Sequence, residues 1–201
     1  MTRAQSFEPA HTAVLSMDLQ SAIVSIYAGN DQDFLTRAAS VLRSARLAKM
    51  TVIHVQVGFR PNLPEISSRN PLFSGIKNSA QHRKIFEGTA GAIHPDVAPE
   101  GDDIVVTKHR ISAFAGTDLD MILRANDIDT LVLFGIATSG VVLSTLLHAA
   151  DADYRLAVIK DCCADLDTEL HTSLLDRFIP RVATVLAAAE VVEAFSSIQN
   201  V

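Results

Sequence analysis

Three stretches of the sequence carry residues that could do chemistry, and each follows an apolar run typical of a buried strand. Asp18 follows TAVLSM (12–17), Lys108 follows DIVVT (103–107), and the loop GIATSG (135–140) follows TLVLF (130–134). A carboxylate at the end of a buried strand can serve as a general acid or base, because burial raises its pKa. A lysine beside it can keep that carboxylate ionised, or neutralise negative charge that develops on a substrate.

Each of these residues also has an ordinary structural interpretation. Asp18 could cap a helix or form a turn, since aspartate is favoured in both places, and Lys108 could be an exposed surface charge. The carboxyl ends of parallel strands meet at one edge of an open α/β sheet, where ligands bind. If the strands are parallel, we therefore expect Asp18, Lys108 and the loop to share one site.

The elements that must position these residues alternate between strands and helices. Further strands are predicted at 51–57, 155–160 and 181–185, and helices at 31–50, 117–126, 168–178 and 187–195, with another helix beginning near Val141. We expect Thr168 and His171 to form the cap of the helix at 168–178. The alternation predicts a three-layer α/β fold. The length of 201 residues predicts a single domain covering 1–201.

The segment 58–101 is rich in proline and glycine, which argues against a long helix or strand there. A segment of this length on a compact sheet is typical of a functional cover or an oligomer contact. Phe59, Phe73 and Phe86 could supply the apolar walls of a small-molecule pocket, or could pack the segment on itself. We interpret the basic residues at 82–84 as a solvated face.

Composition excludes several classes of partner. Seventeen basic and 23 acidic residues give a net charge of −6, which opposes binding to nucleic acid, and no apolar run approaches the ~20 residues of a membrane helix. The N-terminal MTRAQSFEPAHT lacks the apolar core of a secretory signal, so we expect a cytoplasmic protein. Cys162 and Cys163 are expected to be packing residues, and His54 an interior histidine rather than a metal ligand.

Taken together, these features resemble the isochorismatase-like (cysteine hydrolase) superfamily. The resemblance covers about 12–165 and is densest in EGTAGAIHPDVAP, DIVVTKHRISAF, GTDLDMILRANDIDTLVLFGIATSGVVLSTLLHAAD and DYRLAVIKDCCAD. It implies a three-layer Rossmann-like α/β fold with a six-stranded parallel sheet flanked by helices. It also implies a homo-oligomer, either dimer or tetramer, and a site that uses an aspartate, a lysine and usually a cysteine.

Carried over to this sequence, the resemblance places the catalytic aspartate at Asp18 and the lysine at Lys108. It implies a cis peptide between Ile136 and Ala137, with the backbone N–H groups of Ala137 and Val141 forming an oxyanion hole. The cysteine position of the family is Val141 here. A valine side chain has no lone pair, so a covalent thioester route is closed at this position.

The resemblance leaves two hypotheses for function. The first is a hydrolase that acts on a small molecule without a covalent thioester, as do family members that lack the cysteine and use the aspartate as a general acid. The second is a catalytically silent member that serves as a ligand-binding or assembly protein. The metal-binding branch has an aspartate and two histidines after the second strand, which VIHVQVGFRPNLPEI lacks, so we expect no metal and no cofactor. Gln20, Phe59 and Phe114 are further candidates for substrate binding, each with packing as the alternative.

Overall fold

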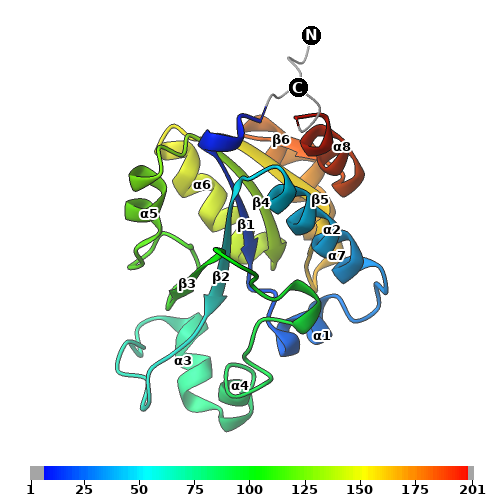
Figure 1. The fold of residues 1–201 in the computed structure, drawn as a ribbon. Helices are drawn as coiled ribbons and strands as arrows, with labels where there is room; N and C mark the ends of the chain where they lie inside the picture. Colours follow the sequence, from blue (N-terminus) through cyan, green and yellow to red (C-terminus); the bar gives the residue numbers. More distant parts are fainter. Residues whose placement is uncertain (1–6, 199–201) are drawn as a thin grey trace.

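The computed structural model describes residues 7–198, which contain a six-stranded parallel sheet flanked by helices (Figure 1). The strand order is β3-β2-β1-β4-β5-β6. The strands are β1 (Thr12–Met17), β2 (Thr51–Val57), β3 (Ile104–Lys108), β4 (Thr130–Ile136), β5 (Arg155–Ala164) and β6 (Thr184–Leu186). The parallel α/β architecture expected from the sequence is confirmed.

The helices lie on both faces of the sheet, with α2 and α8 packed side by side and α5 and α6 on the other side (Figure 1). Their bounds are α1 (Ser21–Tyr27), α2 (Phe34–Leu47), α3 (Pro71–Asn78), α4 (Ala80–Lys84), α5 (Leu119–Ala125), α6 (Leu143–Asp151), α7 (Thr168–Ser173) and α8 (Ala188–Ile198). Short 3₁₀ turns occupy Pro9–His11, Pro95–Val97 and Ile179–Arg181, and wider π-type turns occupy Thr138–Val142 and Leu174–Phe178. Among residues 7–198, every helix is too short or too polar to span a lipid bilayer.

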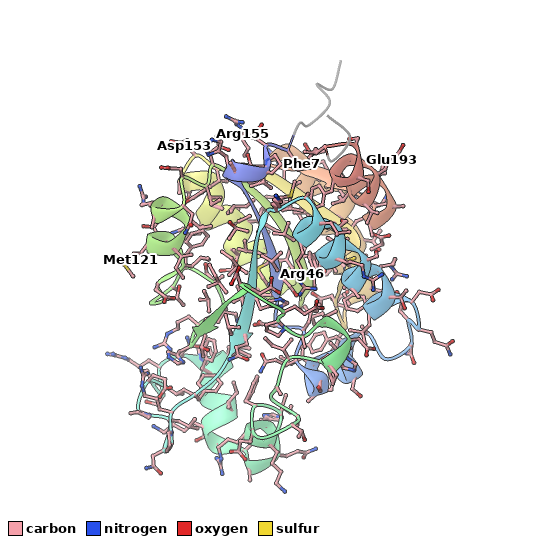
Figure 2. The ribbon with its side chains drawn as sticks, in the orientation of Figure 1. Phe7, Arg46, Met121, Asp153, Arg155 and Glu193 are labelled. Carbon is pink, nitrogen blue, oxygen red and sulfur yellow. The ribbon has the colours of Figure 1, made fainter. Side chains whose placement is uncertain are left out.

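The central strands are buried along their whole length because helices cover both of their faces. All residues of β1 and of β4 are buried, as expected for strands in the middle of a parallel sheet. Helix α2 buries Phe34, Ala38 and Val41, together with Leu42 and Ala45, at the spacing of one helix face. Near the N-terminus of the described residues, Phe7 packs edge-on against Phe195 of α8, with ring centres 5.3 Å apart. Figure 2 labels Phe7 beside that helix.

Strand register brings the candidate residues to one edge. Met17 at the end of β1 pairs with Gly135 of β4, and Val57 at the end of β2 pairs with Lys108 of β3. The strands are parallel, so all their carboxyl ends lie at this edge. Asp18 and the loop that follows β4 therefore emerge at the same place.

Several predicted boundaries differ from the structure. Strand β5 continues to Ala164 and so contains both cysteines. The last strand begins at Thr184 rather than at 181, because a 3₁₀ turn that contains a proline occupies Ile179–Arg181. Helix α7 is capped by Asp167, which accepts a hydrogen bond from the Leu170 N–H at 2.9 Å, so the expected cap at Thr168 was one residue too late.

Candidate active site

Asp18 and Lys108 form a buried ion pair at the carboxyl edge of the sheet. Lys108 Nζ lies 2.7 Å from Asp18 Oδ2, and the two side chains are 4% and 7% exposed. Asp18 has a positive φ of 56°, and its N–H donates to the Val55 carbonyl at 2.7 Å. Lys108 also donates to the Arg110 carbonyl at 3.1 Å. The backbone thus turns at the end of β1 and directs the carboxylate toward the lysine.

The environment of Asp18 suits an acid/base group. Burial raises the pKa of Asp18, and this effect outweighs the opposing influence of the Lys108 charge. Asp18 Oδ1 is buried and has no hydrogen-bond partner among residues 7–198. One carboxylate oxygen is therefore held by the lysine, while the other can hold a proton or meet a ligand.

The loop after β4 approaches β1 so closely that only glycine fits at its start. Gly135 has a φ of 146°, and a Cβ on it would lie 2.1 Å from the Met17 carbonyl oxygen. The peptide between Ile136 and Ala137 is cis. The N–H groups of Gly140 and Val142 both donate to the Ala137 carbonyl, at 3.1 and 3.2 Å. This close approach places Ala137 and the following turn next to the end of β1.

Residues after β5 hold the same loop from the other side. Asp165 Oδ2 accepts hydrogen bonds from the Ser139 N–H at 2.8 Å and from the Ser139 hydroxyl at 2.6 Å. Thr138 Oγ1 lies 2.8 Å from His171 Nδ1 and donates to the Ala164 carbonyl at 3.3 Å. Burial lowers the pKa of His171. The sequence did not predict Asp165 or His171 as site residues, because the strand predicted at 155–160 ended before Asp165, whereas β5 continues to Ala164.

Gln20 lies beside this edge, but both ends of its side-chain amide are hydrogen-bonded to backbone groups. Its Nε2 donates to the carbonyls of Val57 and Gly91 at 2.9 and 2.6 Å, and its Oε1 accepts from the Val57 N–H at 2.9 Å. These bonds join the end of β2 to the segment before β3. The structure thus gives Gln20 a structural role, and substrate binding by it stays a prediction.

The two candidate phenylalanines lie in different surroundings. Phe59 packs edge-on against Phe86 and lines a cavity of about 550 Å³ beside the strand ends. Phe114 stacks on His148 of α6 with ring centres 4.4 Å apart. The ring contacts of Phe114 are thus with His148 and Tyr154 rather than with the ion pair, while Phe59 borders a space large enough for a small molecule.

The two cysteines of the chain do not supply a reactive thiolate. Val141 is 3% exposed, and burial raises the pKa of both cysteines of the chain, that of Cys163 to about 12. A thiol with so high a pKa carries almost no thiolate at neutral pH. Within the part of the chain that the structure describes, no three histidine, cysteine or acidic side chains gather as a metal set. The arrangement therefore offers proton transfer and charge stabilisation.

Comparison with known proteins gives consistent matches over nearly the whole chain. A family model described as the isochorismatase domain matches residues 12–190. The chain is 28% identical to YecD, an uncharacterised isochorismatase family protein of Escherichia coli O157:H7, over 91% of this chain and 95% of that protein. It is 30% identical to the ureidoacrylate amidohydrolase RutB of Agrobacterium fabrum, over 90% of this chain and 89% of the relative. A solved structure of an isochorismatase family protein from Burkholderia thailandensis superposes with a TM-score of 0.81 at 29% identity, covering 95% and 98% of the two chains.

Proposed function

The chain belongs to the isochorismatase family, and from this premise we propose that it hydrolyses a small molecule without forming a covalent thioester. Asp18 acts as the acid/base group, and Lys108 is its electrostatic partner. The backbone N–H groups of Ala137 and Val141 polarise the substrate oxygen that gains negative charge. The similarity to an amidohydrolase supports a hydrolytic reaction of this general kind.

The observation that carries the proposal is the state of the Asp18 carboxylate. Its Oδ2 is 2.7 Å from Lys108 Nζ, whereas its Oδ1 is buried without a partner among the described residues. A buried polar atom without a partner is unfavourable by roughly 1–3 kcal/mol, which favours a proton or a ligand at Asp18 Oδ1. We assign Oδ1 as the atom that gives a proton to the substrate or takes one from the attacking water.

The residue at the expected nucleophile position is the reason for a non-covalent route. The resemblance places the family's cysteine position at Val141, and the Ser139 hydroxyl donates to Asp165 Oδ2 at 2.6 Å. Water activated by Asp18, or protonation of the leaving atom by Asp18, then replaces nucleophilic attack by the protein. Zinc or another cofactor has no assigned role in this scheme.

The buried Val141 also favours a second candidate function. A family member without its nucleophile can be catalytically silent and serve as a ligand-binding or assembly protein. A homo-oligomer, either dimer or tetramer, and a cytoplasmic location remain predictions under both functions. Sedimentation analysis of the purified chain tests the predicted oligomeric state directly.

A substrate screen with three variants tests the proposed function. The assay measures turnover of amides, carbamates and vinyl ethers by wild type, Asp18→Asn, Val141→Cys and Asp102→Asn. Asp102→Asn is the control, because Asp102 is an exposed aspartate at the opposite edge of the sheet. We expect turnover by wild type and by Asp102→Asn, and none by Asp18→Asn. Turnover that survives in Asp18→Asn contradicts the proposed role of this residue. Turnover of amides by Val141→Cys alone supports the silent family member instead.

A further inference from the structure

The cavity that Phe59 borders lies within the segment that joins β2 to β3, and neither Asp18 nor Lys108 lines it. Its volume is about 550 Å³, which is within the range of small-molecule sites. Its apolar walls are Phe59 and Phe86, whose rings meet edge to face with centres 5.3 Å apart. The Phe59 ring also lies 6.4 Å from that of His109, the residue after Lys108. The cavity therefore adjoins the candidate active site and has a built apolar surface of its own.

The polar lining of this cavity is mainly cationic. Arg60, Lys77 and Arg83 line it, together with a single carboxylate, Glu87. This local excess of positive charge stands out in a chain whose net charge is −6. The basic residues at 82–84 were interpreted from the sequence as a solvated face, but Arg83 is half-buried at the cavity wall.

Two of the cations at this wall, Lys77 and Arg83, are held by backbone oxygens and lack a close carboxylate. Arg83 Nη1 donates to the Lys77 carbonyl at 2.6 Å, and Lys77 Nζ donates to the Ile66 carbonyl at 3.4 Å. Among residues 7–198, no carboxylate lies within ion-pairing distance of Lys77 or Arg83, and Arg60 has only Glu65 at 3.8 Å. Backbone carbonyls orient these side chains but leave their charge uncompensated.

We propose that this cavity binds a small organic anion with an apolar body. The carboxylate of the ligand pairs with Lys77 and Arg83, and the apolar part lies against Phe59 and Phe86. The rings supply the hydrophobic contact area, and the guanidinium supplies paired donors of the geometry that a carboxylate accepts. This site is separate from the Asp18–Lys108 pair, so the proposal does not depend on the proposed hydrolysis.

Calorimetric titration with phenylacetate as the probe tests this site. We expect saturable binding of phenylacetate to the wild-type chain, and binding of the neutral analogue phenylacetamide weaker by about tenfold or more. Arg83→Gln and Lys77→Gln should each raise the Kd for phenylacetate by about tenfold. The control Lys84→Gln removes the same charge from an exposed neighbour outside the cavity and should leave the Kd unchanged.

Several results would overturn the proposal. These are the absence of saturable phenylacetate binding, equal affinity for phenylacetamide, or an equal effect of Lys84→Gln and Arg83→Gln. Asp18→Asn should leave the Kd unchanged, and a large loss of phenylacetate binding in this variant would place the ligand at the candidate active site instead. Failure of the substrate screen has no bearing on these outcomes, since they measure binding alone. Circular dichroism of each variant confirms that the fold is retained.

Discussion

The ammonium of Lys108 reaches the carboxylate of Asp18 across an intervening strand. Their nitrogen and oxygen are 2.7 Å apart, yet β3 and β1 are separated by β2 in the sheet. Neighbouring strands are about 4.8 Å apart, so the two backbones are separated by roughly 10 Å at this level. A long lysine side chain can span that separation, whereas a short cationic side chain could not. The sheet topology thus explains why the pair requires a long cationic side chain at the end of β3.

We first predict strong energetic coupling within this pair. Asp18→Ala should lower the free energy of unfolding by about 3–5 kcal/mol, because Lys108 then keeps a buried charge without its partner. Adding Lys108→Met should recover part of this loss, with a coupling energy of about 1–3 kcal/mol in a double-mutant cycle. Urea unfolding at neutral pH measures both values. The exposed pair of Arg124 and Asp120, 2.9 Å apart, is the control and should show far weaker coupling; equal coupling in the two pairs would contradict the prediction.

We next predict that Gly135 tolerates no side chain. A Cβ would lie 2.1 Å from the Met17 carbonyl oxygen, and the φ of 146° is rarely adopted by other residues. Gly135→Ala should therefore lower the free energy of unfolding by more than about 3 kcal/mol. Gly75→Ala is the matched control, because nothing lies within 4 Å of its Cβ position in α3. It should be neutral or stabilise by about 0.5–1 kcal/mol, since alanine favours a helix. Thermal unfolding of both variants would reveal similar effects if the close approach were unimportant.

Short-range patterns in the sequence were enough to predict the parallel sheet and its flanking helices. Strands β1 and β2 have the predicted bounds because their apolar and β-branched runs end at Asp18 and Gly58, residue types that favour turns. Helix α1 was missed because its N-cap residue, Gln20, makes no capping hydrogen bond with its side chain, and because seven residues carry little periodicity. The pair of Asp18 and Lys108 could be anticipated because both follow strands whose ends meet at one edge.

The features that the sequence did not predict all depend on contacts between distant segments. Asp165 binds the loop at Ser139 only because β5 lies next to β4. The cationic cavity exists because α3 and α4 fold back over Phe59. Nothing in the local pattern around Arg83 distinguishes a cavity wall from a solvated face, since both contain the same basic residues.

A third prediction concerns the hydrogen bonds from Ser139 to Asp165. Asp165→Ala removes the acceptor of both the Ser139 N–H and its hydroxyl, which should lower the free energy of unfolding by about 1–3 kcal/mol. Hydrogen exchange at the Ser139 amide should accelerate, while amides of β1 keep their protection. Asp176→Ala changes an exposed aspartate on the following turn and serves as the control. Unchanged exchange at Ser139 in Asp165→Ala would show that this carboxylate does not restrain the loop.

A fourth prediction follows from the buried histidine on β2. His54 Nε2 lies 3.1 Å from Asp103 Oδ2, which also binds Arg46 at 2.6 Å; Figure 2 labels Arg46. Burial lowers the pKa of His54 despite Asp103, so the unfolded chain takes up a proton first as the pH falls through about 6.5. Stability is therefore fully present above that pH and declines below it, by up to about 1.4 kcal/mol per pH unit.

Urea unfolding at several pH values measures this slope. His54→Gln should flatten the decline below about pH 6.5, because glutamine does not titrate. The remaining slope includes His171, whose pKa burial also lowers. His82→Gln, at an exposed position, is the control and should keep the wild-type slope. A steep decline that persists in His54→Gln would exclude His54 as its main source.

The last prediction concerns the titration of Asp18 itself. Burial raises the pKa of Asp18, while the charge of Lys108 acts to lower it. The carboxyl should therefore titrate above the ordinary value of about 3.9, and Lys108→Met should move it higher still, since the lowering influence is removed. Carbon-13 NMR of labelled aspartate follows this titration without any need for a substrate. If wild type turns over a substrate, a rate that falls as the pH rises through this pKa identifies Asp18 as the general acid, and a rate that rises identifies it as the base. A titration at or below the ordinary value, or a downward shift in Lys108→Met, would show that burial does not control this carboxylate.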